Sequence, residues 1–181
     1  IRSIARTLEA DLTRDVFLGE RANEQTVKTV DLSAYRVLAF ATHGLVPGDL
    51  DGLTQPALAL TAPEVAKVEG DGLLTMEEIL GLRLNADWVV LSACNTASGQ
   101  GTGAEAVSGL GRAFFYAGAR ALLVSNWPVE TTSARLLTTD LFRRQRANPG
   151  LSRAKALQQT MNWLIDEEQF VDPTTKRAVF S

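Results

Sequence analysis

Two residues of this 181-residue sequence are candidates for covalent chemistry, because His43 and Cys94 are its single histidine and its single cysteine. Each directly follows a short, nearly continuous apolar run, His43 after residues 36–42 and Cys94 after residues 87–93. Such runs are typical of parallel strands that are buried on both faces. If the two strands are neighbours, their carboxyl ends lie about 5 Å apart, so the imidazole and the thiol can meet above the sheet.

A thiol beside an imidazole is sufficient for acyl transfer. His43 can take the thiol proton, which leaves Cys94 as a thiolate nucleophile, and can later protonate the leaving amine. Gly44 lets the backbone approach a substrate closely, so its N–H and that of Cys94 are candidate oxyanion donors. We therefore predict His43 and Cys94 as catalytic residues, Gly44 and Cys94 as the oxyanion hole, and no organic cofactor. No metal is expected either, because one histidine and one cysteine are too few for a zinc site of these ligands.

Alternative roles for the same residues fit less well. A lone cysteine is often a small buried hydrophobe and a lone histidine a structural residue, but core packing does not require them at equivalent ends of two strands. A nucleophile elbow needs glycine two residues before and after the nucleophile, where Ser92 and Thr96 stand. A redox pair lacks its second cysteine, and the glycine-rich segment 98–103 lacks the lysine of a phosphate-binding loop. Another acyl transfer through the same thiol remains open.

Strand-like and helix-like segments alternate along the chain, which favours an α/β fold with a mostly parallel sheet and helices on both faces. A third apolar run at 120–125 predicts another strand, and we expect the first two runs to be central. Apolar spacings of three and four predict helices over 104–117 and 130–146. Ser152 is expected to cap a further helix, whose apolar side comprises Ala156, Leu157, Thr160, Leu164 and Ile165.

The amino-terminal part is less regular. Residues 1–10 indicate the end of a helix, residues 16–18 a short strand, and residues 21–30 a helix that leads into the first apolar run.

The segment from Pro47 to Gly72 is rich in glycine and proline, which predicts long loops around a hairpin or edge strand at 57–60. Thr75 and Glu78 then have the spacing of a capping box, which opens a short helix.

Composition excludes several classes of protein. With 45% hydrophobic and 22% charged residues the chain is not disordered, and no run of ~18 apolar residues is available to cross a bilayer. A net charge of −3 gives no basic face for nucleic acid. A single cysteine cannot form an internal disulfide, which favours a cytoplasmic protein.

The chain begins with Ile1 and ends after an apolar pair, so we expect one domain over residues 1–181, cut from a longer protein.

Several motifs occur in a fixed order: ATHG at 41–44, DGLLT at 71–75, VVLSACNT at 89–96, AGA at 117–119 and SNWPV at 125–129. Together they resemble the CHAT-domain family, relatives of caspases and separases. The resemblance implies a caspase-like three-layer sandwich and peptide-bond hydrolysis by a Cys/His dyad. It also implies that Ser125, Asn126 and Trp127 help to shape the substrate pocket.

Members of this family are often fused to helical repeats such as TPRs and act in bacterial signalling. The resemblance therefore implies a cysteine endopeptidase, regulated by flanking domains or by a partner. The expected partners are a protein or peptide substrate and a TPR-type domain in the same chain, with no nucleic acid and no membrane. The alternative is a caspase-like interaction module with an idle dyad, and the dependence of Cys94 reactivity on His43 distinguishes the two.

Overall fold

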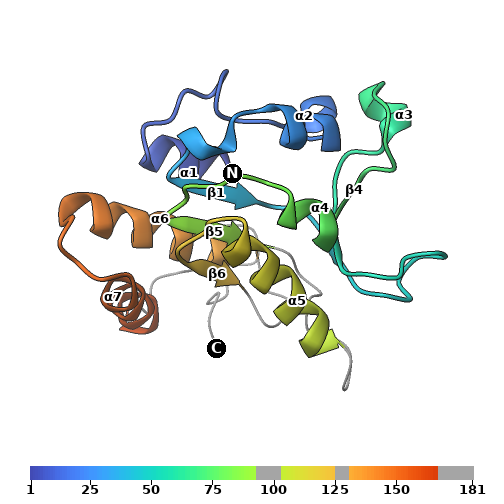
Figure 1. The fold of residues 1–181 in the computed structure, drawn as a ribbon. Coiled ribbons are helices and arrows are strands. Elements are labelled where there is room, and N and C mark those ends of the chain that lie inside the picture. The colour runs from blue at the N-terminus through green and yellow to red at the C-terminus, as the bar shows by residue number, and fades with distance from the viewer. Residues whose placement is uncertain (93–102, 125–130, 167–181) are drawn as a thin grey trace, which may run out of the picture. The chain divides into compact units, whose positions relative to one another are not determined.

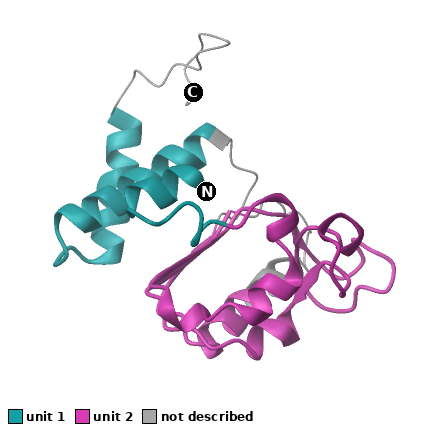
Figure 2. Ribbon diagram, turned by 90° about the horizontal axis from the view of Figure 1, so that it is seen from above, with its two compact units in different colours: residues 1–16, 129–181 teal, residues 17–128 magenta. Residues whose placement is uncertain are grey.

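The computed structural model describes residues 1–92, 103–124 and 131–166 (Figure 1), and the chain divides into two compact units (Figure 2). Unit 1 comprises Ile1–Val16 and Val129–Ser181, and unit 2 comprises Phe17–Pro128. The elements of unit 1 are α1 (Arg2–Thr7), α6 (Thr131–Ala147) and α7 (Arg153–Asp166). Those of unit 2 are η1 (Gly19–Arg21), α2 (Glu24–Thr29), η2 (Leu32–Ala34), β1 (Val37–Phe40), β2 (Gly44–Leu45), β3 (Ala57–Ala59), α3 (Pro63–Ala66), β4 (Leu73–Thr75), α4 (Met76–Leu80), β5 (Trp88–Leu91), α5 (Gly103–Tyr116) and β6 (Leu122–Val124).

The first sheet of unit 2 consists of three parallel strands in the order β1-β5-β6. The register pairs Phe40 with Leu91 and Leu91 with Val124, so the three strands end at the same edge. All four residues of β5 are buried, as expected of a middle strand that is covered on both faces. The predicted α/β fold with a parallel sheet is confirmed, but β1, which was expected to be central, lies at an edge of the described sheet.

Helix α5 packs on one face of this sheet. Side chains alternate along a strand, so Leu38 and Phe40 of β1 share a face with Val89 and Leu91 of β5. These side chains join one apolar cluster with the fully buried Phe114 of α5, whose ring centroid lies 5.7 Å from that of Phe40. The helix predicted from the apolar spacing over 104–117 is thus confirmed within one residue.

The chain requires a glycine where it leaves α5. Gly118 has a φ of +113°, and a Cβ atom at this position would lie 2.2 Å from the carbonyl oxygen of Leu84. The backbone N–H of Leu84 also donates to the carbonyl oxygen of Ala117 over 2.8 Å. A side chain at position 118 would therefore push the segment before β5 away from the helix end.

Charged side chains join the amino ends of the three parallel strands. Arg36, Asp87 and Arg120 stand just before β1, β5 and β6. Nη2 of Arg36 lies 2.6 Å from Oδ2 of Asp87, and Nη1 of Arg120 lies 3.5 Å from Oδ1 of Asp87. These groups are partly exposed, so each pair contributes only about 0.5 kcal/mol. Their effect is to align the amino ends of the three strands, whereas His43 follows the carboxyl end of β1.

The second sheet of unit 2 is antiparallel, in the order β2-β3-β4. Strand β3 lies at the place expected for a hairpin or edge strand within residues 47–72, but it is the middle strand of the sheet, and its partners β2 and β4 lie on either side of that segment. Strand β4 leads directly into α4 through the predicted capping box, which is also confirmed. Oγ1 of Thr75 accepts from the N–H of Glu78 over 3.3 Å, and Oε2 of Glu78 accepts from the N–H of Thr75 over 2.8 Å.

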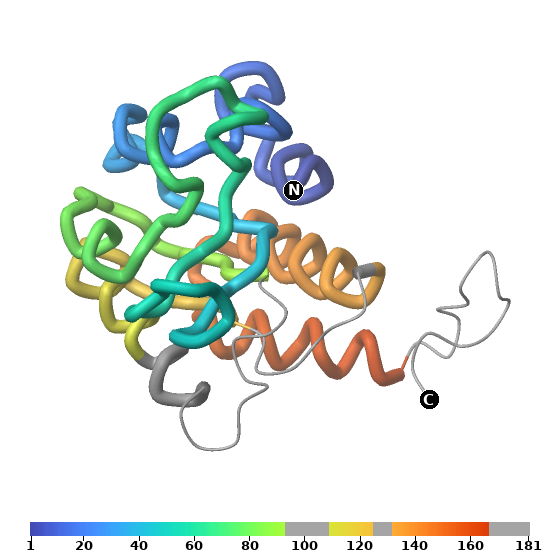
Figure 3. Tube along the Cα trace, turned by 90° about the vertical axis from the view of Figure 1, so that its right-hand side faces the viewer, coloured from blue at the N-terminus to red at the C-terminus, as the bar shows by residue number. Residues whose placement is uncertain are grey.

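Unit 1 is organised around α6, which contacts both α1 and α7; Figure 3 shows α6 and α7 running beside each other. Between them the buried carboxylate of Asp140 accepts hydrogen bonds from Arg143, from Nε of Arg144 at 2.5 Å and from Oγ1 of Thr160 at 2.9 Å. Ser152 caps α7 as predicted, since its Oγ accepts from the N–H of Lys155 over 3.3 Å.

Two expectations for the amino-terminal part of the chain need correction. Residues 16–18 form no strand, because they pair with no strand in the described part of the chain; Val16 is buried while Leu18 is exposed. The helix expected over residues 21–30 is shorter, because Asn23 caps α2 by accepting from the N–H of Thr26 over 2.8 Å. Apolar content alone does not make a strand without a neighbour to pair with.

The expected apolar side of α7 is also wrong in part. Ala156, Thr160 and Leu164 are buried, but the side chain of Ile165 is 73% exposed. The buried residues follow one another at intervals of four, and Ile165 is rotated from that line by one residue, about 100°.

Candidate active site

His43 lies between β1 and β2 in unit 2, and its side chain is exposed. Its backbone is fixed by β3, because its carbonyl oxygen accepts from the N–H of Ala59 over 2.8 Å. On the preceding residue, Oγ1 of Thr42 donates to the carbonyl oxygen of Ala59. The histidine therefore has an anchored main chain and a side chain that solvent can reach, a combination that a buried structural histidine lacks.

Gly44 is buried and pairs with Leu58 of β3 in antiparallel register. The hydrogen bond from Ala59 to His43 flanks this pair, so Gly44 and Leu58 form a pair that does not exchange its own hydrogen bonds. In such a pair the N–H and C=O groups of both residues point away from the partner strand. The N–H of Gly44 thus points away from β3.

The register brings the carboxyl ends of β1 and β5 side by side. Phe40 pairs with Leu91, and the N–H of Ser92 donates to the carbonyl oxygen of Phe40 over 2.9 Å. This slanted bond belongs to the parallel ladder, so the pairing is intact up to Phe40 and Leu91.

Four of the predicted site residues lie outside the described residues. They are the nucleophile Cys94 and the pocket residues Ser125, Asn126 and Trp127. Their roles stay predictions, as do the roles assigned to His43 and Gly44.

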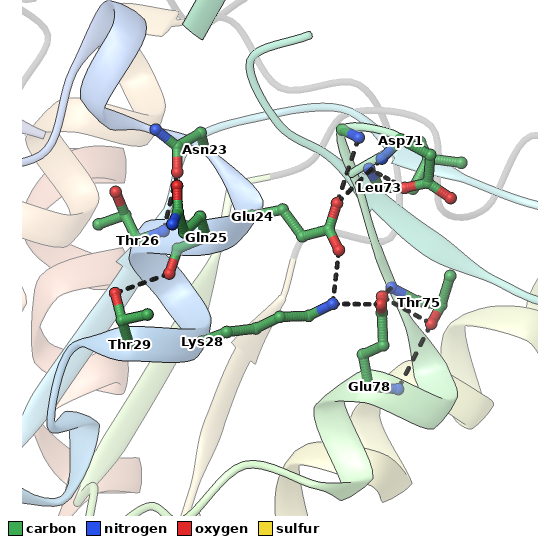
Figure 4. Close-up of polar contacts among 11 residues, drawn as sticks. Asn23, Glu24, Gln25, Thr26, Lys28, Thr29, Asp71, Leu73, Thr75 and Glu78 are labelled. Carbon is green, nitrogen blue, oxygen red and sulfur yellow. Dashed lines mark hydrogen bonds and ion pairs between the residues drawn. The ribbon is translucent and has the colours of Figure 1, made fainter. Parts of the chain in front are cut away.

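A polar network joins α2 to the second sheet, which anchors His43. The carboxylate of Glu24 in α2, 7% exposed as a residue, accepts from the N–H groups of Asp71 and Gly72 at 3.2 and 3.3 Å. Nζ of Lys28 lies 2.5 Å from Oε1 of Glu24 and 2.6 Å from Oε1 of Glu78. Figure 4 shows Lys28 reaching between the two carboxylates, so the network joins α2, the turn before β4, and α4.

The network shifts two pKa values. The hydrogen bond to Glu24, followed by the one to Glu78, raises the pKa of Lys28 above its ordinary value. Burial acts to raise the pKa of Glu78, but hydrogen bonds from Lys28 and from the N–H and Oγ1 of Thr75 outweigh it and lower that pKa. Both shifts favour the charged forms, so the ion pair is intact at neutral pH.

The roles of Glu24 and Lys28 were missed by sequence analysis. A Glu and a Lys four residues apart on a short helix are ordinary surface residues in a sequence. The one available signal was the pair Gly70 and Gly72, since two glycines around Asp71 indicate a tight turn whose N–H groups need an acceptor.

Neither a metal site nor a membrane segment is found in the part of the chain that the structure describes. No group of three or more His, Cys, Asp or Glu residues there is placed to hold a metal ion. None of the described helices combines the length and the apolar character needed to cross a bilayer.

Comparison with known proteins agrees with the resemblance of the motifs. The family model of the CHAT domain matches residues 1–177, which confirms the predicted family. Tetratricopeptide repeat protein 28 of Mus musculus is 30% identical over 153 residues, which cover 76% of this chain and 6% of that protein. The chain therefore spans only a small part of the length of this curated relative.

Proposed function

The chain belongs to the CHAT domain family, and on that premise we propose that it is a cysteine endopeptidase with Cys94 as nucleophile and His43 as general base. The family is caspase-like and related to peptidases. That relationship supports a single caspase-like domain over residues 1–181, with a three-layer sandwich built on the parallel sheet.

The register of β1 and β5 is the observation that supports this function most directly. Phe40 and Leu91 are paired, and His43 and Cys94 each follow their paired residue by three positions. Equal spacing from a common register is the sequence geometry that a dyad on adjacent parallel strand ends needs. Exposure of the His43 side chain supports the same assignment.

In the proposed reaction His43 takes the proton of the Cys94 thiol, and the thiolate attacks the carbonyl carbon of the scissile peptide bond. The N–H groups of Gly44 and Cys94 stabilise the tetrahedral oxyanion; the orientation of the Gly44 N–H away from β3 supports its part in this role. The protonated imidazole then gives its proton to the leaving amine, and water hydrolyses the thioester. No step requires a metal or an organic cofactor.

The substrate is a protein or peptide, and Ser125, Asn126 and Trp127 shape the pocket for the residue before the scissile bond. Regulation comes from flanking domains or a partner, and the tetratricopeptide repeats named in the mouse relative support a helical-repeat domain in the same protein. The single cysteine, which excludes an internal disulfide, supports a cytoplasmic setting.

Labelling of Cys94 by an electrophilic peptide tests the proposal. In the full-length protein, mass spectrometry is expected to find the label on Cys94, and His43→Ala is expected to slow labelling about 10²-fold because the general base is lost. Cys94→Ala is the blank, and cleavage of a peptide library by the wild type, absent in Cys94→Ala, gives the substrate preference.

An interaction module with an idle dyad gives a different result. There the folded protein, tested together with its partner, leaves Cys94 unlabelled, or labels it at the same rate in wild type and His43→Ala. Either observation would overturn the endopeptidase.

A further inference from the structure

The main chain at His43 is held by one residue of the second sheet. Ala59 donates its N–H to the carbonyl oxygen of His43 at 2.8 Å, and its own carbonyl oxygen accepts from Oγ1 of Thr42. Any displacement of Ala59 along or across the sheet therefore moves the backbone that carries the imidazole.

Ala59 is held in turn by the chain on either side of β4. It pairs with Leu73, and the next residue, Leu60, donates its N–H to the carbonyl oxygen of Gly72 over 2.7 Å. The end of β3 is thus attached to the turn formed by residues 70–72.

Glu24 of α2 also binds that turn. Its carboxylate accepts from the N–H groups of Asp71 and Gly72, and it lies so close to Gly70 that a Cβ there would be 2.3 Å from Oε2. Gly70 also has a φ of +126°, where side chains are rarely tolerated. The turn is therefore built around this carboxylate.

Lys28 connects the same carboxylate to the end of β4. Its ammonium group bridges Glu24 and Glu78, and Oε2 of Glu78 accepts from the N–H and the hydroxyl of Thr75, the last residue of β4. Both ends of β4, at Gly72 and at Thr75, are consequently fixed by one charged network (Figure 4).

We propose that Glu24 is a positioning residue for His43, acting through the residue 70–72 turn and β3 to fix the backbone that carries the imidazole. The proposal rests on the function proposed above for His43. It adds that the place of the base is controlled by a carboxylate on α2, 19 residues before the histidine in the chain.

Alkylation of Cys94 by iodoacetamide as a function of pH tests this proposal in the 181-residue chain. Glu24→Gln keeps the shape of the side chain but loses the charge. It is expected to slow alkylation at pH 7 about tenfold, because small misplacements of a catalytic group are costly. The midpoint of the pH profile is expected to rise toward about 8.5, the value of a thiol without a base beside it.

The matched control is Asp140→Asn, which neutralises a buried carboxylate with three donors in the other unit. It is expected to lower the stability of the chain while keeping the wild-type midpoint. A role of Glu24 in stability alone would give the same result for Glu24→Gln, so a wild-type rate and midpoint in folded Glu24→Gln would overturn the positioning role.

Three further variants make each outcome decisive. His43→Ala reports on the dyad itself: if it leaves the alkylation rate unchanged, the proposed function fails, whatever Glu24→Gln shows. If Glu24→Gln does not fold, Lys28→Gln replaces it, because the Lys28 side chain is 41% exposed. Lys28→Gln is expected to raise the midpoint and Lys28→Arg to restore it, and a wild-type midpoint in Lys28→Gln would overturn the proposal.

Discussion

Each of the two compact units contains a buried carboxylate that accepts several hydrogen bonds, but the donors come from different distances along the chain. In unit 1, Asp140 is served by two arginines of its own helix and by Thr160, twenty residues on. In unit 2, Glu24 accepts from Lys28 of its own helix and, unlike Asp140, from two backbone N–H groups far along the chain, those of Asp71 and Gly72, 47 and 48 residues on.

The positions of the donors along the chain determine which segments a buried charge holds together. Donors on the same helix and the next one fix a single helix pair, so the consequences of losing Asp140 should remain near α6 and α7. Donors far along the chain fix the path of loops, so the loss of Glu24 should reach the second sheet and everything attached to it.

Removal of Glu24 is expected to have the largest effect. Glu24→Ala leaves the N–H of Gly72 buried without an acceptor and Lys28 with one carboxylate instead of two. We expect a loss of about 3 kcal/mol in the free energy of unfolding, measured by urea denaturation. Gln25→Ala, at the exposed neighbouring position of α2, should change it by less than about 0.5 kcal/mol. Equal losses in the two variants would contradict the prediction, because Glu24 would then stabilise the fold no more than an exposed residue does.

Removal of Asp140 is expected to cost less, about 2 kcal/mol, because its arginines can return to solvent when the carboxylate is lost. Arg143 is already 67% exposed in its side chain and Arg144 is 28% exposed. Amide hydrogen exchange in Asp140→Ala should accelerate in α6 and α7 and remain at the wild-type level in β1 and β5. Gln158→Ala, on the exposed side of α7, is the control, and faster exchange in the parallel sheet would contradict the local role.

The stabilising contributions of Asp140 in unit 1 and of Lys28 in unit 2 are expected to be lost at opposite ends of the pH scale. Burial acts to raise the pKa of Asp140, but the hydrogen bonds from Arg144, Thr160 and Arg143 outweigh it and lower that pKa. The stabilisation by Asp140 is then complete above its unfolded pKa of about 3.9 and is lost as the pH falls through the lower folded value. The difference in unfolding free energy between wild type and Asp140→Asn should therefore shrink below about pH 4.

The Lys28 bridge behaves in the reverse sense. Because the folded pKa of Lys28 is raised, its stabilisation is complete below its unfolded pKa of about 10.4 and is lost as the pH rises through the folded value. The difference between wild type and Lys28→Gln should persist through neutral pH and shrink above about pH 10. Urea denaturation of the three proteins across pH measures both trends, and a Lys28→Gln difference that is already gone at pH 8 would contradict the bridge.

The features predicted correctly from the sequence are those with a local or periodic cause. Strands β1, β5 and β6 are continuous apolar runs, α5 has an apolar face, and the capping box of Thr75 and Glu78 lies within four residues. The adjacency of β1 and β5 was an assumption in the sequence and is confirmed by the pairing of Phe40 with Leu91. The place of His43 shortly after β1 followed from that run, whereas the place of Gly44 in β2 did not.

The features that the sequence did not predict depend on contacts between distant segments. Strands β2 and β4 have two and three residues, too few for a pattern, and exist because β3 pairs with both. The apolar residues 16–18 were predicted as a strand but do not form one, since no strand in the described part pairs with them. Glu24 resembles a surface residue in the sequence, because its burial depends on contact with the distant residue 70–72 turn.

The order β1-β5-β6 has a consequence for synthesis of the chain. Trp88 follows its partner Val37 by 51 residues, and Leu122 follows its partner Val89 by 33. During translation β1 therefore has no parallel neighbour until β5 has left the ribosome. Strand β6 can join the sheet only after α5 has been made. Pairing across such separations is slow, so the emerging chain holds an apolar strand edge that a chaperone can bind before the sheet closes.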